Sequence, residues 1–350
     1  MNFSATLLTW YALHKRDLPW RQTNDPYLVW LSEVILQQTR VDQGMRYYLA
    51  FAENYPDVKK LAAAKEEQVL KLWQGLGYYS RARNLHATAR FVAERHDGKF
   101  PSTYKELLTL KGIGDYTAAA ISSFCFNEAQ PVVDGNVYRV LSRVFGLATP
   151  IDSTQGKKEF RALAAEVMDK RNAAQYNQAV MEFGALQCVP KNPDCGACPL
   201  NLHCEACRKE SVDQLPVKAK KTKQSERFFH YLVLRHNTHV YIRQRSGKDI
   251  WQHLFDFPLI ETKAALSEKQ LGKHPEWRAL LGDTPHALQH FSAEMKHVLS
   301  HQRLHVRFAE IELEKALPDK LSKSWLKIPE ERLEEYAVPI LIHNYLKSRA

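Results

Sequence analysis

The chain has 350 residues, of which 45% are hydrophobic and 25% are charged, and this size and composition exclude a peptide-scale scaffold, a disordered chain and a fibrous protein. Its 49 Lys and Arg residues against 39 Asp and Glu give a formal net charge of +10, which leaves nucleic acid, an anionic membrane surface or an acidic molecule as candidate partners. At about 150 residues per domain, the length predicts two domains.

Residues 1–212 have the pattern of an all-helical domain. Apolar residues recur at three- and four-residue intervals over 31–41 and over 61–76, which places them on one face of a helix. Prolines such as Pro26 and Pro101 separate these segments. We predict a bundle of many short helices.

A second domain is predicted after a polar, lysine-rich stretch at 213–227, DQLPVKAKKTKQSER, which has the composition of an exposed linker. Beyond it the pattern changes to period two, as in 229–233 and 304–308, and helical segments interrupt or follow the strands. Residues 228–350 are therefore predicted to form an α+β domain.

No apolar run approaches the ~18 residues of a membrane-spanning helix, and the N-terminal segment lacks the features of a signal peptide. Five of the six cysteines crowd into one short stretch, which favours a metal or iron–sulfur site in a reducing compartment over a disulfide framework. We expect a cytoplasmic protein without a membrane partner, acting as a monomer.

Four of these cysteines, Cys188, Cys195, Cys198 and Cys204, have the spacing C-x6-C-x2-C-x5-C. Four thiolates on one loop suit an iron–sulfur cluster, whereas structural zinc more often shows paired short spacings. Zinc and unligated thiols remain alternatives on chemistry alone. Cys207 lies outside the pattern and is interpreted as incidental.

The cysteine spacing resembles the C-terminal 4Fe–4S loop of the endonuclease III superfamily of DNA base-excision glycosylases, and it follows a helical region of the right size. The resemblance implies a mainly structural 4Fe–4S cluster held by the four cysteines. It also implies that Lys191, between the first two cysteines, contacts a DNA phosphate. A solvated surface lysine is the alternative interpretation.

A glycine-containing turn at 110–115, LKGIGD, precedes the helical segment TAAAISSF. Gly112 and Gly114 can bring the backbone close to a phosphate, where amides at a helix N-terminus attract the anion. A simple helix–turn–helix corner is the alternative. Read together with the cysteine loop, LKGIG resembles the turn of the superfamily's helix-hairpin-helix motif, which follows the DNA backbone without reading its sequence.

Two carboxylates are candidates for breaking an N-glycosidic bond. The leaving base needs a proton and the sugar develops positive charge, so one carboxyl group acts as general acid and the other stabilises the oxocarbenium ion. Glu33 lies in WLSEVILQQT and Asp134 in VDGNVYRVL. Without context, Glu33 could be a surface residue of an amphipathic helix and Asp134 a helix N-cap.

Both segments resemble signature segments of the MutY family of adenine DNA glycosylases, and the resemblance spans essentially the whole chain. It implies that Glu33 protonates adenine at N7 and then helps to activate water, while Asp134 stabilises the sugar cation. Asn136 is implied to orient the acid pair. Gln37 and Gln38 are implied to lie at the opened duplex against the orphaned guanine lesion.

The segment GLGYYSRAR at 75–83 fits the same resemblance. An aromatic wedge replaces the stacking lost when a base is flipped out of a kinked duplex. The resemblance implies that Tyr78 is this wedge, beside the oxidised guanine. Two core tyrosines at a helix start are the alternative interpretation, more so for Tyr79 than for Tyr78.

The second hairpin helix separates two kinds of glycosylase. Bifunctional members of the superfamily carry a lysine there, which attacks the sugar and leads to strand cleavage. The aligned residue here is Tyr116, whose phenol cannot form a Schiff base, so we predict a monofunctional enzyme with Tyr116 lining the sugar side of the pocket. Lys111 precedes the hairpin glycines and is expected to face DNA phosphate.

The segment 240–261, VYIRQRSGKDIWQHLFDFPLIE, resembles the opening of a MutT-type Nudix fold. No R-E-x-x-E-E cluster follows it, so we predict a binding module and not a hydrolase. Within this domain KHVLSHQRL resembles the family's Phe-Ser-His hairpin, which distinguishes 8-oxoguanine from guanine. Ser300 and His301 match the hairpin and Leu299 replaces the Phe; a plain β-turn is the alternative.

The sequence therefore predicts a base-excision repair enzyme that removes adenine mispaired with 8-oxoguanine or guanine from double-stranded DNA. A bifunctional pyrimidine-lesion glycosylase is disfavoured by Tyr116 and by the second domain. An iron–sulfur DNA-binding regulator without chemistry is disfavoured by the acid pair. A free-nucleotide pyrophosphatase is the weakest alternative.

Overall fold

The computed structural model describes residues 2–219, 224–323 and 325–349. The chain forms two compact units, one made of Met1–Ala63 and Asn84–Lys221 and the other of Ala64–Arg83 and Thr222–Ala350. Residues 220–223 of the predicted linker lie outside the described residues. The predicted class, a helical domain followed by an α+β domain, is confirmed. In the described part of the chain, no helix is long and apolar enough to cross a membrane.

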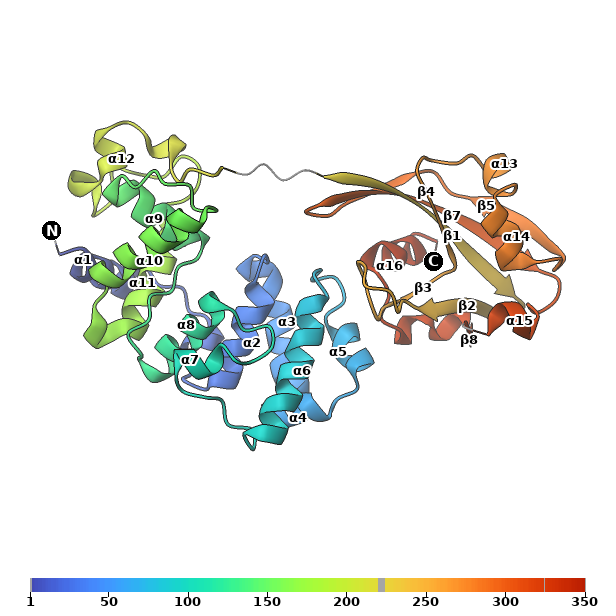
Figure 1. The fold of residues 1–350 in the computed structure, drawn as a ribbon, viewed down its shortest axis with the longest axis horizontal. Helices are drawn as coiled ribbons and strands as arrows, with labels where there is room; N and C mark the ends of the chain where they lie inside the picture. The colour runs from blue at the N-terminus through green and yellow to red at the C-terminus, as the bar shows by residue number, and fades with distance from the viewer. Residues whose placement is uncertain (1, 220–223, 324, 350) are drawn as a thin grey trace. The chain divides into compact units, whose positions relative to one another are not determined.

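The first unit is helical (Figure 1). Its α-helices among the described residues are joined by short connections, except for the long cysteine loop between the last two. They are α1 (Phe3–His14), α2 (Pro26–Leu36), α3 (Val41–Asn54), α4 (Val58–Ala63), α6 (Ser80–Arg95, whose first turn belongs to the second unit), α7 (Tyr104–Leu107), α8 (Asp115–Phe126), α9 (Gly135–Phe145), α10 (Thr154–Val167), α11 (Ala173–Leu186) and α12 (Glu205–Arg208).

Helix ends in this unit follow from local sequence. Asp25 caps α2, its Oδ1 accepting a hydrogen bond of 2.9 Å from the Tyr27 amide, and Pro26 occupies the first turn. The periodic pattern over 31–41 predicted continuous helix, but α2 ends at Leu36 and Gln38 has φ of +59°. A left-handed residue cannot continue a right-handed helix, so α3 starts afresh at Val41.

The core of the helical unit lies where α9 and α11 pack on each other and on α1 and α10. Its fully buried side chains include Leu7, Val140, Phe160, Phe183 and Leu200. Leu200 comes from the cysteine loop, so this loop is part of the core that fixes α9.

The second unit is built on an eight-stranded mixed sheet of the described residues, with the order β3-β2-β1-β7-β5, β4 pairing with β1, β6 with β7 and β8 with β2. Among the strand pairs of the described residues, only β1 and β7 are parallel. The strands are β1 (Ser225–His236), β2 (His239–Gln244), β3 (Phe255–Asp256), β4 (Leu259–Thr262), β5 (His286–Phe291), β6 (Met295–Val298), β7 (Gln302–Leu313) and β8 (Leu326–Pro329).

Helices cover both faces of this sheet (Figure 1). Leu232 and Leu234 of β1 pack with residues of α13 (Glu268–Leu271) and α14 (Pro275–Leu281). On the other face Phe308 stacks on Tyr345 of α16 (Ile340–Lys347), with ring centroids 3.7 Å apart. All residues from Phe229 to Leu234 are therefore buried, and not every second one.

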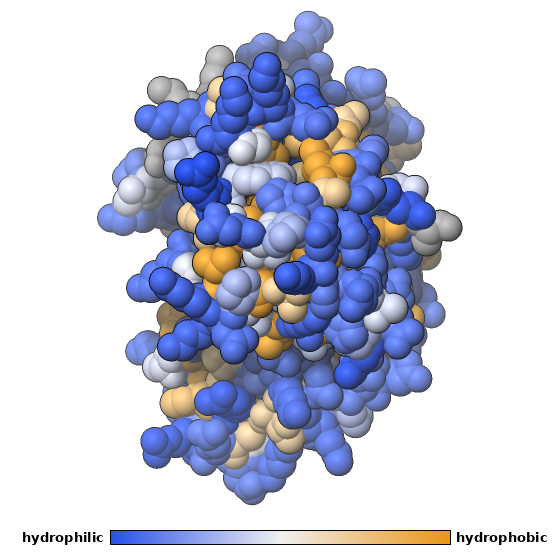
Figure 2. All heavy atoms as spheres, turned by 90° about the vertical axis from the view of Figure 1, so that its right-hand side faces the viewer, coloured by the Kyte–Doolittle hydropathy of each residue, from blue (hydrophilic) through white to orange (hydrophobic). Residues whose placement is uncertain are grey.

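Two boundaries differ from the sequence prediction. β1 begins at Ser225, inside the predicted linker, because its polar first residues pair with β7 from Ser225 opposite Gln302 onward. Residues 64–83, which include α5 (Glu66–Leu72), pack with the second unit although the pattern placed them in the helical domain. One face of the molecule, shown in Figure 2, is mainly hydrophilic with small separate hydrophobic patches.

The stack on Phe308 predicts a large stability effect. Phe308→Ala should lower the free energy of unfolding by about 3–5 kcal/mol, because a fully buried ring is removed and a cavity remains. Urea denaturation followed by circular dichroism measures it. Leu326→Ala, at a side chain that is 45% exposed, is the control and should cost less than about 1 kcal/mol. Equal effects of the two substitutions would contradict the packing described.

Candidate active site

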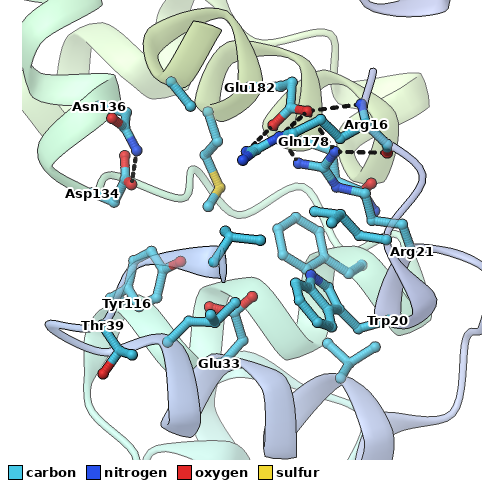
Figure 3. Close-up of a pocket in the computed structure, with 17 residues that line it drawn as sticks. Arg16, Trp20, Arg21, Glu33, Thr39, Tyr116, Asp134, Asn136, Gln178 and Glu182 are labelled. Carbon is cyan, nitrogen blue, oxygen red and sulfur yellow. Dashed lines mark hydrogen bonds and ion pairs between the residues drawn. The ribbon is translucent and has the colours of Figure 1, made fainter. Parts of the chain in front are cut away.

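A cavity of about 190 Å³ lies in the helical unit beside α2 and the N-terminal ends of α8 and α9 (Figure 3). A cavity of roughly 150 Å³ can hold a benzene ring, so this one has room for a flat heterocycle. Its wall is unusually rich in titratable and amide side chains for a buried site: Arg16, Arg21, Glu33, Tyr116, Asp134, Asn136, Gln178 and Glu182.

Glu33 reaches this cavity from α2 and is only 7% exposed. The pKa of its carboxyl group is raised to about 7, mainly by burial and in part by the nearby charge of Asp134, although a hydrogen bond from Tyr116 and the charge of Arg21 oppose the rise. A carboxyl group with this pKa is present in both protonation states near neutral pH. It can therefore donate a proton and later accept one.

Asp134 caps α9, which is one of the two interpretations that its sequence left open, and it also lines the cavity. Its Oδ1 accepts a hydrogen bond of 2.8 Å from the Val137 amide, and its Oδ2 accepts one of 2.8 Å from Asn136 Nδ2. Burial raises the pKa of Asp134 above its ordinary value, and these bonds and the charge of Arg139, which favour the ionised form, offset only part of the rise. Asp134 thus has the dedicated donors that a carboxylate needs.

Arg139 continues this network from the cavity toward the cysteine loop. Its Nη2 donates to Asn136 Oδ1 at 2.9 Å and its Nε donates to the Cys188 carbonyl at 2.7 Å. The backbone of Gly184 on α11 approaches so closely that a Cβ there would lie 2.7 Å from Asn136 Cβ. Position 184 therefore admits no larger residue without moving Asn136.

A buried ion cluster forms the opposite wall, and sequence reasoning missed it. Glu182 accepts bonds of 2.7–2.9 Å from Arg16 and Arg21. Burial disfavours the Glu182 charge, but the two guanidinium groups outweigh this and lower its pKa to about 2. The only sequence signal was a lone acidic residue in the apolar run 179–186. Its partners lie more than 150 residues away.

The predicted hairpin lies between α7 and α8, with Lys111, Gly112 and Gly114 exposed. Gly112 has φ of +76° and a Cβ there would meet Asn84, so a glycine is required. Gly114 is the N-cap of α8 and has no heavy atom near its Cβ position. Exposed backbone at the start of α8 can bind an anion.

Gln37 and Gln38 follow α2 at the rim of the helical unit. Gln37 Nε2 donates to Thr117 Oγ1 at 3.3 Å, which ties the end of α2 to α8. Gln38 is exposed and left-handed. The two glutamines therefore differ, since one is held by the fold and the other projects outward.

The four predicted cysteine ligands and Cys207 line one cavity together. Arg143 donates to the Cys188 thiol at 3.5 Å. In the described ranges, no three or more Cys, His, Asp or Glu side chains meet in the geometry of a site for one metal ion. Ligands of a cubane cluster surround a cavity instead of meeting at one point, so these thiols fit such a cluster. Lys191 lies exposed on the same loop.

A second cavity, of about 530 Å³, lies within the second unit. It is lined by the wedge segment around Tyr78, by the β6–β7 hairpin with Leu299, Ser300 and His301, and by Trp251. The Tyr78 hydroxyl is hydrogen-bonded to the Ser300 hydroxyl. The structure thus brings together Tyr78 and Ser300, which are 222 positions apart in sequence.

Comparison with known proteins agrees with this arrangement. Residues 31–169 match the HhH-GPD superfamily of base excision DNA repair proteins, and residues 230–348 match the NUDIX domain. The adenine DNA glycosylase of Buchnera aphidicola subsp. Schizaphis graminum is 35% identical over 262 residues, which cover 75% of this chain and 76% of that protein. The chain belongs to the MutY family of adenine DNA glycosylases.

Other relatives of this MutY-family chain support the same assignment. The Homo sapiens adenine DNA glycosylase is 42% identical over 61% of the chain and 41% of that protein. A thermostable thymine-DNA glycosylase has a similar fold, with a TM-score of 0.55, 29% identity and coverage of 59% of this chain and 95% of that one. An endonuclease III–DNA complex matches with a TM-score of 0.52 and 21% identity, and the match covers 59% of this chain and 94% of that one. At this identity the match shows a shared fold.

As a member of the MutY family the chain is a DNA glycosylase, and the structure groups its predicted site residues into four places. Glu33, Tyr116, Asp134 and Asn136 line the first cavity. Tyr78, Ser300 and His301 line the second. The hairpin glycines and Lys191 lie on two exposed loops of the helical unit and line neither cavity.

The raised pKa of Glu33 predicts a pH-dependent stability. Its folded-state pKa of about 7 exceeds the ordinary glutamate value of 4.5, so the contribution of Glu33 to the stability of the wild type falls as pH rises from about 4.5 to 7. Glu33→Gln should abolish this loss and raise the free energy of unfolding above pH 7 by up to about 3 kcal/mol. Urea denaturation of both proteins between pH 4 and 8 measures the difference, and a difference independent of pH would contradict the burial of an ionisable Glu33.

Proposed function

We propose that this chain excises adenine mispaired with 8-oxoguanine or guanine in double-stranded DNA and leaves the strand uncut. The observation that carries the proposal is the first cavity, where Glu33 with a pKa of about 7 shares a wall with Asp134. The choice of adenine as the excised base follows from the relatives that are named adenine DNA glycosylase. Residues 1–63 and 84–212 break the bond, and residues 64–83 together with 228–350 read the opposite base.

The two carboxyl groups divide the chemistry according to their surroundings. Glu33 holds a proton near neutral pH and donates it to N7 of adenine as the base leaves. Asp134, held ionised by the Val137 amide and Asn136, stabilises the positive sugar. Glu33, now ionised, accepts a proton from the water that attacks the sugar, and this attack completes the hydrolysis.

Tyr116 supports a monofunctional reaction. It occupies the position of the lysine nucleophile of bifunctional relatives, and its phenol is hydrogen-bonded to Glu33. Burial and the two nearby carboxylates raise its pKa well above the usual value, so the phenol stays neutral. A neutral phenol forms no Schiff base with the sugar, and the strand therefore remains intact after the base has left.

DNA is held by backbone and side-chain contacts on the helical unit. The exposed amides after Gly112 and Gly114 bind a phosphate, and Lys191 binds another. Gln37 and Gln38 occupy the space beside the orphaned base. The net charge of +10 favours this partner.

The second cavity is the site for 8-oxoguanine. Ser300 and His301 bond the edge of the oxidised purine, and Tyr78 fills the stack beside it. Its volume of about 530 Å³ accommodates such a base. Leu299 in place of a phenylalanine contributes an apolar contact without a ring to stack.

The base-release assay is the test of this function. Duplexes with adenine opposite 8-oxoguanine, guanine or cytosine are incubated with excess enzyme, with and without alkali. We expect adenine release opposite the first two, a strand break only after alkali, and a rate that falls as pH rises past about 7 because Glu33 loses its proton.

Glu33→Gln should lower the single-turnover rate at least about 100-fold while the mispair is still bound. Glu53→Gln, at an exposed glutamate of the same unit, is the matched control. Unchanged base release by Glu33→Gln would refute the assignment of the acid, and strand cleavage without alkali would refute the monofunctional reaction.

A 4Fe–4S cluster, bound by Cys188, Cys195, Cys198 and Cys204, completes the proposal. The cluster crosslinks the loop and so fixes the end of the helical unit. Cys198→Ser should lower bound iron and inorganic sulfide of the purified protein to less than about half and lower its melting temperature. Cys125→Ser, outside the loop, should change neither. Full iron and sulfide content in Cys198→Ser would exclude Cys198 as a ligand.

A further inference from the structure

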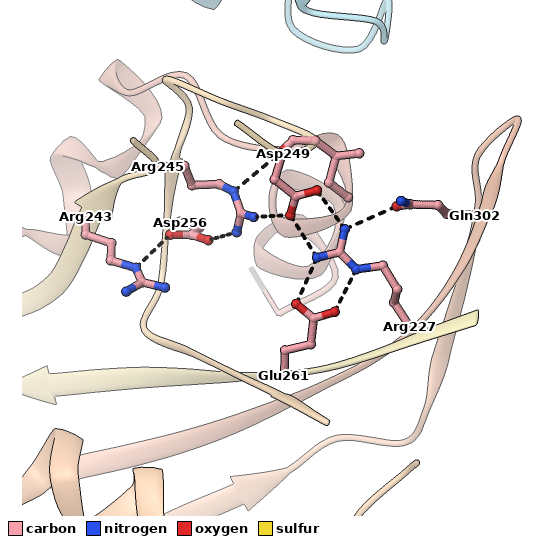
Figure 4. A network of polar contacts seen from close by, with 8 residues as sticks. Arg227, Arg243, Arg245, Asp249, Asp256, Glu261 and Gln302 are labelled. Carbon is pink, nitrogen blue, oxygen red and sulfur yellow. Dashed lines mark hydrogen bonds and ion pairs between the residues drawn. The ribbon is translucent and has the colours of Figure 1, made fainter. Parts of the chain in front are cut away.

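Arg227, near the start of β1, is the centre of a polar network in the second unit (Figure 4). Its Nε and Nη2 donate to the two oxygens of Glu261 at 2.7 and 2.8 Å. Its Nη1 and Nη2 donate to the two oxygens of Asp249, both at 2.8 Å, and Nη1 also donates to Gln302 Oε1 at 3.3 Å. A guanidinium has five N–H donors, and this set of bonds uses all of them.

The partners of Arg227 come from three separate segments. Asp249 lies in the connection between β2 and β3, Glu261 on β4, and Gln302 at the first residue of β7 directly after the Ser300–His301 turn. One side chain that is 17% exposed therefore joins the β2–β3 connection to the base of the β6–β7 hairpin.

Both of these segments form the wall of the second cavity. Asp249, Trp251 and Gln302 line it together with Ser300 and His301. Arg227 does not line the cavity. Its atoms therefore shape the site through Asp249 and Gln302, without touching what the site binds.

The β2–β3 connection depends on such an anchor, because its backbone is locally unfavourable. Trp251 and His253 have φ of +60° and +69°, a region that residues with a Cβ adopt only when surrounding contacts hold them there. Asp249 supplies such contacts through Arg227 and through Arg245, whose Nη2 donates to Asp249 Oδ2 at 3.1 Å.

We propose that Arg227 is a positioning residue that determines the preference for 8-oxoguanine, by fixing the β2–β3 connection and the β6–β7 hairpin on either side of the second cavity. The inference rests on the proposed function. The bonds from Arg227 to Glu261 and Asp249 require a planar guanidinium group. A lysine keeps the positive charge, but its ammonium group cannot form these paired bonds, so lysine does not replace Arg227.

The test compares two mispairs in each variant. Dissociation constants are measured for duplexes that hold a non-hydrolysable adenine analogue opposite 8-oxoguanine or opposite guanine, and the single-turnover rate is measured on the guanine:adenine duplex. In Arg227→Lys and in Glu261→Gln, whose residue bonds Arg227 and does not line the cavity, the affinity ratio between the two duplexes should fall about tenfold, while the rate on guanine:adenine stays within about twofold of the wild type.

Arg303→Lys is the matched control, because Arg303 lies next to Gln302 on β7 and bonds only the exposed Glu226 in the described structure. It should keep the wild-type ratio. Thermal melting checks that each variant is folded, and Glu261→Gln keeps the test valid if Arg227→Lys does not fold. A wild-type ratio in both folded variants would overturn the inference. A wild type without preference between the mispairs, or without adenine release, would overturn the proposed function itself.

Discussion

Burying two carboxyl groups in one cavity is unfavourable, because each group loses its hydration and each repels the charge of the other. The helical unit resolves this by giving the two groups unequal surroundings. Asp134 accepts hydrogen bonds from the Val137 amide and Asn136, which favour its ionised form and offset part of the effect of burial. Glu33 has a hydrogen bond with the Tyr116 phenol, and its pKa is raised to about 7. In the reaction proposed above, hydrogen bonding therefore separates the general acid from the charge stabiliser, although both are carboxylic acids.

The position of α9 follows from the same requirement. Asp134 and Asn136 act only if the first turn of α9 is fixed, and Arg139 and Arg143 tie the helix to the carbonyls of the cysteine loop. Gly184 lets α11 pack directly on Asn136. The loop therefore supports the active site mechanically. Arg227 supports the second cavity in a similar way. It joins two segments that line this cavity, but Arg227 itself does not line it.

Residues in local motifs were accessible from sequence, whereas residues whose role depends on distant partners were not. The segments around Glu33 and Asp134 named the acid pair, and the structure places both in one cavity. Glu182 was missed because its partners Arg16 and Arg21 lie at the other end of the unit in sequence. The helix break at Gln38 and the early start of β1 were missed because backbone geometry and strand pairing, and not apolar periodicity, decide them.

The most direct test of this account is the titration of Glu33 itself. Protein labelled with ¹³C at the glutamate carboxyl carbons is titrated by NMR, and the Glu33 signal is assigned by its absence in Glu33→Gln. The account predicts a midpoint near pH 7, well above the ordinary glutamate value of 4.5. A midpoint near 4.5, the value of an unperturbed glutamate, would contradict it, because Glu33 would then hold no proton to give to adenine at neutral pH.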